Sequence, residues 1–233
     1  MKVIPMSLDY FRHTITDEEL FSLMEEKLYA AVIADACDQQ GFPNQGMDHR
    51  IRLMTDSAVK VAGRAMTILT VDIYEITDDP YGREIEAIDN VKVNDIVVVC
   101  TNYSVRAGFW GQILSTAARA RGAKGAVLDG LTRDVEKIKQ MGFPVFACGR
   151  SVLDSKGRMT VVNYNCPVVC GGVLVRPGEI VFGDSDGVVV IPREREKEIL
   201  EASFAKVEKE NRTLEELRKG KFLREAYKKY GVL

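Results

Sequence analysis

Apolar residues recur along this chain with the periods of helices and strands, most clearly between Gly108 and Asp134. Four of them lie on one face of a predicted helix that begins near Gly111 and stops at Gly122, a residue suited to a left-handed cap. These four residues are Ile113, Leu114, Ala117 and Ala118. A buried strand is predicted next, over residues 125–129.

A further helix is predicted after that strand, with Thr132 as its N-cap and apolar residues at positions 135, 138 and 141. Arg133 and Asp134 then lie at the start of this helix, just past the carboxyl end of a strand. Open α/β sheets bind ligands at such edges. We therefore expect the active site between the start of the Gly111 helix and the Arg133-Asp134 pair.

Sequence patterns also predict helices, strands and turns in the rest of the chain. A capping box formed by Thr16 and Glu19 predicts the first helix, and a second helical run follows over residues 31–37. A turn at Gly63-Arg64 is expected to separate two strands. The remaining predictions are a loop over 41–56, strands over 57–71, 93–100 and 143–147, a polar turn over 78–82, short strands with tight turns over 161–192, and a charged helical tail after Pro192.

Sequential strand–helix–strand units, followed by short strands and terminal helices, indicate an α/β fold. A chain of 233 residues with 46% hydrophobic content can bury one full core. We expect a single domain over residues 1–233, with a core of about 15–192 and a C-terminal helical extension of about 193–233.

Charge and composition narrow the classes of partner. The net charge of −2 provides no field to attract nucleic acid or anionic lipid, so neither a nucleic-acid partner nor a membrane is expected. No apolar run approaches membrane-spanning length, and the N-terminus lacks the apolar core of a signal peptide, which indicates a cytoplasmic protein. The five cysteines are scattered in apolar settings typical of buried thiols, and with only two histidines they complete no zinc set.

The residue types at the expected site favour chemistry on a 2-oxo acid. Amides at the start of the Gly111 helix can hold a carboxylate or carbonyl oxygen, and the guanidinium of Arg133 matches a carboxylate. Asp134 offers a hard oxygen for one divalent cation, most typically magnesium, with manganese as the alternative. A cation chelated by a 2-oxo acid stabilises a pyruvate-enolate-like intermediate, which describes a lyase. The alternative to a catalytic site is a surface pair without catalytic function, in which Asp134 interacts favourably with the helix dipole and Arg133 forms an ion pair.

The order Gly108, Gln112, twenty residues and then Arg133-Asp134 resembles the signature of the RraA-like family. That family includes metal-dependent 4-hydroxy-4-methyl-2-oxoglutarate and 4-carboxy-4-hydroxy-2-oxoadipate aldolases. Further resemblance lies at residues 34–36, 63–67 and 183–189, so that it covers roughly residues 15 to 215. It implies a swivelling β/β/α domain that assembles as a homotrimer or homohexamer with sites at the subunit boundaries.

The resemblance also implies roles for individual residues. Arg133 would bind the carboxylate or keto oxygen of the substrate, Asp134 would carry the metal, and amides over residues 111–114 would bind the 2-oxo acid. Asp35 and Glu208 match acidic residues that approach a neighbouring subunit's site, with Glu210 as the alternative in register. For Asp35 the residues alone favour an exposed helix carboxylate.

One position departs from the aldolases, which have an acidic residue where this chain has Gln112. That acid helps to hold the water that shuttles the proton in aldol cleavage, whereas a neutral amide can orient water but cannot take its proton. We therefore expect decarboxylation of a substrate such as oxaloacetate to survive better than aldol cleavage. The alternative function, also implied by the resemblance, is a non-catalytic regulator that binds and inhibits a ribonuclease.

Overall fold

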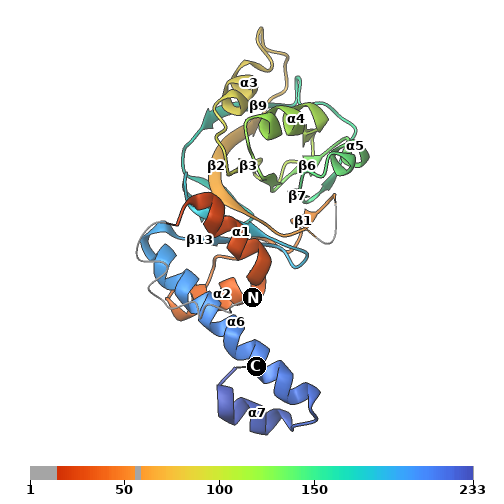
Figure 1. The fold of residues 1–233 in the computed structure, drawn as a ribbon. Helices are drawn as coiled ribbons and strands as arrows, with labels where there is room; N and C mark the ends of the chain where they lie inside the picture. The colour runs from red at the N-terminus through yellow and green to blue at the C-terminus, as the bar shows by residue number, and fades with distance from the viewer. Residues whose placement is uncertain (1–14, 56–58, 233) are drawn as a thin grey trace.

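A computed structural model describes residues 15–55 and 59–232 of the chain (Figure 1). The N-terminal segment that lacks the apolar core of a signal peptide lies outside the described residues, with one of the two histidines, His13. Ser57, with which a strand is predicted to begin, also lies outside them. In the part described, no helix is both long and apolar enough to cross a membrane.

Eight strands of the described chain form one mixed, curled sheet (Figure 1). Its order is β1-β7-β5-β3-β2-β12-β13, and β9 pairs with the far end of β2. Neighbours among β2, β3, β5 and β7 are parallel, and the remaining pairs are antiparallel. The strands are β1 (Arg52–Leu53), β2 (Val61–Asp72), β3 (Asp95–Cys100), β5 (Gly125–Leu128), β7 (Val145–Ala147), β9 (Met159–Tyr164), β12 (Ile180–Gly183) and β13 (Val188–Ile191).

Two small sheets complete the β structure of the described residues. One consists of three parallel strands, β4 (Gly108–Trp110), β6 (Leu131–Thr132) and β8 (Gly149–Arg150), in the order β4-β6-β8. The other is an antiparallel hairpin of β10 (Val168–Cys170) and β11 (Val173–Val175). The small parallel sheet matters most for function, because it brings the loops after β4 and β6 together.

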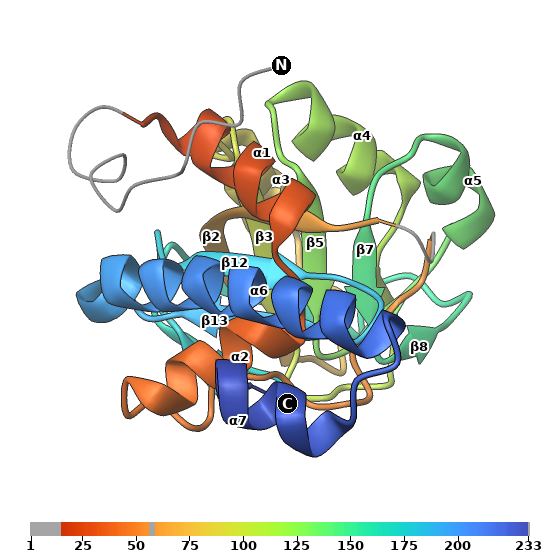
Figure 2. The same cartoon turned by 60° about the horizontal axis from the view of Figure 1, so that its bottom comes forward.

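Helices cover the sheet in two groups, which Figures 1 and 2 show from different sides. One group, at the end of the molecule that carries β4 and β6, consists of α3 (Gly82–Asp89), α4 (Gln112–Ala120) and α5 (Val135–Gln140). The other group consists of α1 (Asp17–Lys27), α2 (Ala30–Gln39), the short 3-10 turn η2 (Arg193–Arg195), α6 (Glu196–Arg218) and α7 (Leu223–Tyr230). The C-terminal half of α6 and all of α7 project from the body (Figure 1).

The core is divided by the sheet, because successive side chains of a strand point to opposite faces. In β3, Val97 and Val99 pack with Trp110 and Phe143 on the face covered by α3, α4 and α5. Ile96 and Val98 pack on the other face, with Phe146 and the β10–β11 hairpin. A third apolar cluster joins α1, α2 and α6 to β12 and β13 around three buried rings, Phe21, Phe182 and Phe204.

Several predictions are confirmed. The capping box at the start of α1 is formed, with Glu19 N donating to Thr16 Oγ1 at 3.3 Å and Thr16 N donating to Glu19 Oε2 at 2.9 Å. The late short strands and the charged terminal helices are present. The turn at residues 184–187 is a hairpin connection, closed by a bond of 3.0 Å from Asp184 N to Gly187 O. The mixed α/β fold class is confirmed, and the extent of the domain stays a prediction.

The predicted turn at Gly63-Arg64 is wrong, because β2 runs straight through it and pairs there with both β3 and β12. Glycine is required at position 63 because the backbone of Asn94 packs closely against it, and not because the chain turns there. A Cβ at Gly63 would lie only 2.4 Å from Asn94 O. The strand predicted from residue 93 begins at Asp95 instead, since Asn94 has a left-handed φ of 68°.

Two further segments differ from the prediction. The loop expected over 41–56 contains β1, which pairs with β7 through Arg52 and Leu53. The segment after the turn at 78–82 forms α3, which was not predicted. All five cysteines are free thiols, but only Cys37, Cys100 and Cys170 are fully buried. The expectation of buried thiols therefore holds for those three, while Cys148 and Cys166 are partly exposed.

Candidate functional site

The start of α4 and the Arg133-Asp134 pair meet at the end of the small parallel sheet. Gly108 and Trp110 of β4 pair with Leu131 and Thr132 of β6, so the residues that follow each strand emerge side by side. Arg133 N donates to Trp110 O at 2.8 Å, which extends this pairing by one residue. The predicted neighbourhood of the α4 helix start and Arg133-Asp134 is therefore present.

Thr132 is not the N-cap of the following helix. It lies in β6, where its Oγ1 donates to Trp110 O at 2.8 Å and strengthens the β4–β6 connection. Asp134 occupies the N-cap position of α5 instead, with a left-handed φ of 57°. Its carboxylate makes no bond to α5 and points to the neighbouring helix start, where Gln112 N donates to Asp134 Oδ2 at 3.2 Å.

Glycine at position 111 allows this close arrangement. A Cβ there would lie 2.9 Å from Asp134 Oδ2 and 3.1 Å from Arg133 Cγ and Nε. The φ of Gly111 is −147°, which any residue adopts, so the requirement is for space rather than for backbone freedom. The backbone at the start of α4 is thus packed directly against both candidate side chains.

The first turn of α4 offers two amides to a ligand. Among the described residues, Ile113 N and Leu114 N donate to no backbone or side-chain acceptor, as expected for the first turn of a helix. Ile113 is 78% exposed, so it is not packed with the rest of the apolar face that the pattern predicts. Ser115 is buried in its stead, because its Oγ accepts from Trp110 Nε1 and donates to Gly111 O.

The guanidinium of Arg133 lies between two carboxylates. Its Nη1 is 3.0 Å from Asp154 Oδ1, and its Nε is 3.9 Å from Asp134 Oδ2. The second Asp154 oxygen accepts a hydrogen bond from Tyr81 OH. Burial opposes ionisation of Asp154, but the bond from Tyr81 and the charge of Arg133 outweigh it and hold the pKa of Asp154 below its usual value.

A third carboxyl group, that of Glu84, lies close to this cluster. Burial raises the pKa of Glu84, in the first turn of α3, to about 7, and the neighbouring charge of Asp154 acts in the same direction. The bond from Ser155 Oγ to Glu84 Oε2, at 3.4 Å, and the charge of Arg133 oppose the rise. Glu84 is therefore a carboxyl group that changes its charge near neutral pH.

Sequence reasoning missed Tyr81, Glu84 and Asp154. Residues 78–82, which include Tyr81, are predicted only as a polar turn, and Asp154 lies in a loop without any motif. One signal was available for Glu84, because the apolar spacing of Ala87, Ile88 and Val91 fits a short helix with Glu84 in its first turn.

The donor set at Asp134 fits a weakly ligated divalent cation. In residues 15–55 and 59–232, no group of three or more His, Cys, Asp or Glu side chains is arranged to hold a metal ion. The Asp134 side chain is 37% exposed, and its Oδ1 has no hydrogen-bond partner among the described residues. A single carboxylate of this kind suits magnesium, which keeps several water ligands and completes its shell with substrate oxygens.

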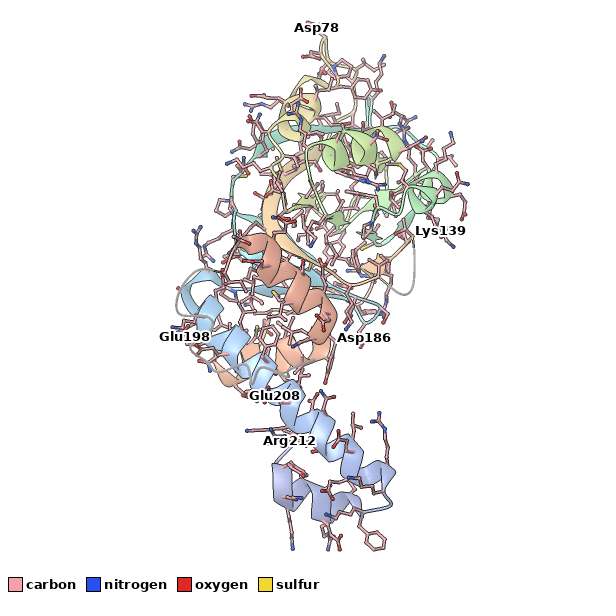
Figure 3. All side chains as sticks on the ribbon, in the orientation of Figure 1. Asp78, Lys139, Asp186, Glu198, Glu208 and Arg212 are labelled. Carbon is pink, nitrogen blue, oxygen red and sulfur yellow. The ribbon has the colours of Figure 1, made fainter. Side chains whose placement is uncertain are left out.

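Asp35 and Glu208 do not join this site within one chain. They lie on α2 and α6, whereas Arg133 lies beside α4 and α5 at the other end of the molecule; Figure 3 labels Glu208 on the lower half of the structure. Asp35 is exposed and forms an ion pair with Lys206. Glu208 is exposed, and Glu210, its alternative in register, accepts a hydrogen bond from Tyr29 OH.

This chain is similar to a known protein family and to individual proteins of known sequence. The family model described as "RraA-like: Aldolase/RraA" matches residues 30–190. Protein DlpA of Legionella pneumophila is 30% identical over 201 residues, which are 86% of this chain but 32% of that protein. A protein of Methanocaldococcus jannaschii that carries no functional name is 33% identical over 195 residues, covering 83% of this chain and 88% of its own length.

Some relatives and some solved structures carry functional names. The "Putative 4-hydroxy-4-methyl-2-oxoglutarate aldolase" of Halalkalibacterium halodurans is 33% identical over 122 residues, 52% of this chain and 58% of that protein. The crystal structure of Streptomyces coelicolor RraAS2, an unusual member of the RNase ES inhibitor RraA protein family, matches with a TM-score of 0.74 and 25% identity. That match covers 90% of this chain and all of RraAS2 (100%).

Proposed function

The chain belongs to the RraA-like family, and we propose that it is a divalent-metal-dependent carbon–carbon lyase acting on a 2-oxo acid. Relatives named as 4-hydroxy-4-methyl-2-oxoglutarate aldolases support the lyase class. The observation that carries the proposal is the contact between Asp134 Oδ2 and Gln112 N, since it brings an arginine, a carboxylate and two unpaired amides to one point.

Each group at this point has a role in the proposal. Ile113 N and Leu114 N bind carboxylate or keto oxygens of the substrate, helped by the positive end of the α4 dipole. Arg133 binds the substrate carboxylate with its planar, positively charged guanidinium. Asp134 holds the divalent cation, most typically magnesium, with manganese as the alternative. When bound, the cation supplies Lewis-acid stabilisation of negative charge on the 2-oxo oxygen.

Decarboxylation is the proposed preference, with oxaloacetate as the probe substrate. In this reaction the bond to the departing carboxylate breaks, carbon dioxide leaves, and the electron pair stays with the pyruvyl fragment until water protonates it. No base has to remove a hydroxyl proton. Aldol cleavage does require that step, and the Gln112 side chain, a neutral amide, cannot accept the proton.

We propose that the active form is a homotrimer or homohexamer. Asp35 and Glu208 are exposed on α2 and α6, far from Arg133 of the same chain, so they are available to the site of a second copy. The charged tail formed by α6 and α7 projects from the body and provides a surface for such assembly (Figure 1).

A panel assay tests the proposed function. Purified chain is incubated with oxaloacetate or with 4-hydroxy-4-methyl-2-oxoglutarate, with magnesium or manganese, and with a chelator as the control. We expect metal-dependent release of pyruvate from oxaloacetate, lost in Arg133→Ala and kept in Arg121→Ala, which removes a surface arginine paired with Asp89. Full activity of the Arg133→Ala variant with both substrates would end the proposal.

The alternative is a regulator that binds and inhibits a ribonuclease, favoured by the likeness to RraAS2 of the RNase ES inhibitor RraA protein family. Such binding would not depend on the Asp134 carboxylate. Co-purification with a ribonuclease that persists in Asp134→Ala, together with absence of turnover by the unmodified chain, would favour this alternative over the lyase.

A further inference from the structure

The ion pair between Arg133 and Asp154 leaves most of the guanidinium available. The closest atoms of this ion pair are Arg133 Nη1 and Asp154 Oδ1, 3.0 Å apart. Among the described residues, neither Nη2 nor Nε donates a hydrogen bond to a protein acceptor, and Nε lies 3.9 Å from Asp134 Oδ2. A guanidinium is a planar fork that binds a carboxylate with two nitrogens of one edge. Since Asp154 uses one nitrogen, the edge formed by Nε and Nη2 remains for a ligand.

Asp154 is itself fixed from two sides. Tyr81 is the N-cap residue of α3, and its hydroxyl group donates a hydrogen bond to Asp154 Oδ2. The loop that carries Asp154 is attached to β4, because Gly108 N donates to Leu153 O at 2.9 Å. The neighbouring residue Ser155 is buried. The position of the Asp154 carboxylate is therefore set relative to the strand that leads into α4.

Without Asp154, the nearest partner for the Arg133 guanidinium is Asp134. The distance of 3.9 Å from Nε to Asp134 Oδ2 is too long for a hydrogen bond but short enough for a small side-chain rotation to close it. A closed pair would place the arginine on the carboxylate proposed to hold the cation, and it would use the edge needed for substrate. A carboxylate on the opposite side of the guanidinium prevents this collapse.

We propose that Asp154 and Tyr81 are positioning residues for Arg133. Tyr81 fixes Asp154, and Asp154 holds one nitrogen of the guanidinium so that its free edge faces the carboxylate of a 2-oxo acid at the start of α4. This inference rests on the proposed function. The pair contributes affinity by avoiding the loss of side-chain freedom that a long arginine otherwise undergoes on binding. It touches no reacting atom.

The solvent exposure of the Arg133–Asp154 pair distinguishes a positioning role from a role in stabilising the fold. The Arg133 and Asp154 side chains are 32% and 33% exposed. Ion pairs with such exposure contribute little to stability, about 1 kcal/mol or less. Loss of the Asp154 charge should therefore leave the unfolding midpoint nearly unchanged, while the Michaelis constant for the substrate changes strongly.

Asp154→Asn tests the proposal, since it keeps the shape of the side chain and removes its charge. We expect KM for oxaloacetate to rise about tenfold, with a smaller change in kcat, because ground-state binding of the substrate carboxylate is lost. Tyr81→Phe should raise KM about threefold on its own and add nothing in the Asp154→Asn background, since the two residues act in series. Asp154→Glu should restore KM to within about threefold of the original value.

Asp89→Asn is the matched control, because it removes an Arg-Asp pair of 2.7 Å, with Arg121, away from the site. An unchanged KM in both Asp154→Asn and Tyr81→Phe, in a chain that turns over oxaloacetate, would overturn the positioning role and leave the lyase proposal intact. A rise in KM equal to that of Asp89→Asn would also overturn it. If the unmodified chain neither turns over nor binds a 2-oxo acid, the lyase proposal fails and this inference fails with it.

Discussion

The Asp134 carboxylate accepts a hydrogen bond of 3.2 Å from the backbone amide of Gln112, although 22 positions separate the two residues in the sequence. The bond joins the residue after β6 to the first turn of α4. It brings the charge of a carboxylate to a helix start that would otherwise favour an anionic ligand. The exposed oxygen of Asp134 and the remaining amides of α4 therefore face the same small volume.

Gly111→Ala tests how closely this arrangement is packed. The added methyl group would lie 2.9 Å from Asp134 Oδ2 and 3.1 Å from Arg133 Nε, so both side chains must move. We expect kcat/KM for oxaloacetate to fall about a hundredfold, because displacements of this size disrupt substrate geometry. The free energy of unfolding should fall by only about 1 kcal/mol, since the displaced groups are partly solvated.

Gly46→Ala is the control for that substitution, because nothing lies within 4 Å of a Cβ at Gly46 and its φ is not left-handed. Its activity should equal that of the unmodified chain. Activity of Gly111→Ala within about twofold of the unmodified chain would contradict the close packing of the site.

Asp134→Asn separates the charge of this residue from its hydrogen bond. An asparagine oxygen can still accept from Gln112 N, so the start of α4 should keep its shape and the melting temperature should change little. The variant loses the hard anionic ligand for the cation. We expect calorimetric titration with magnesium or manganese to show binding to the unmodified chain and at least about tenfold weaker binding to the variant. Equal affinity in both would exclude Asp134 as the metal ligand.

The neighbourhood of the site was predictable because it follows from local patterns. A glycine before an amphipathic run located the start of α4. The strand over 125–129 predicted Arg133 and Asp134 just past its end, and the structure adds the short strand β6 between that strand and the pair. What could not be predicted depends on distant contacts. Asp154 approaches Arg133 because β8 pairs with β6 and Leu153 O accepts from Gly108 N. A two-residue strand such as β8 has no period to recognise.

The wrong turn at Gly63-Arg64 has a similar origin. A glycine inside a β-branched run indicates either a turn or a close approach of another backbone, and the sequence does not distinguish them. In this chain the neighbour is Asn94 O, about thirty positions away, and its contact keeps β2 continuous across the sheet. Thr132 shows the same limit, because its hydroxyl serves the carbonyl of Trp110 rather than a helix start.

Glu84 should make the stability of the fold depend on pH. Burial raises its pKa from 4.5 to about 7, so the folded chain binds this proton more tightly than the unfolded chain. As pH rises from about 4.5 to about 7, the unfolded state loses the proton first and the free energy of unfolding falls; above pH 7 the loss stays constant. Its size should be about 1 to 3 kcal/mol, reduced by residual contact with water.

Urea unfolding of the unmodified chain and of Glu84→Gln at several pH values measures this effect. The variant should lack the decline, so its advantage should be larger at pH 8 than at pH 4. Glu136→Gln, which changes an exposed carboxylate on α5, serves as the control and should follow the unmodified chain. Parallel pH curves for Glu84→Gln and the unmodified chain would show that Glu84 ionises in the folded state as readily as in the unfolded one.

Gln112→Glu should shift the balance between the two lyase reactions. Position 112 is the first residue of α4, where a carboxylate is favoured by the helix dipole. Gln112 is partly exposed, and its backbone amide contacts Asp134. An acid there can accept a proton through water, and general base catalysis contributes about a hundredfold or more to such steps. We expect pyruvate release from 4-hydroxy-4-methyl-2-oxoglutarate to rise at least about tenfold relative to decarboxylation of oxaloacetate.

Gln112→Asn keeps a neutral amide and should leave that ratio unchanged. Efficient aldol cleavage by the unmodified chain, without decarboxylation, would refute the assignment of the preference to Gln112, since the missing base would then be supplied by another group.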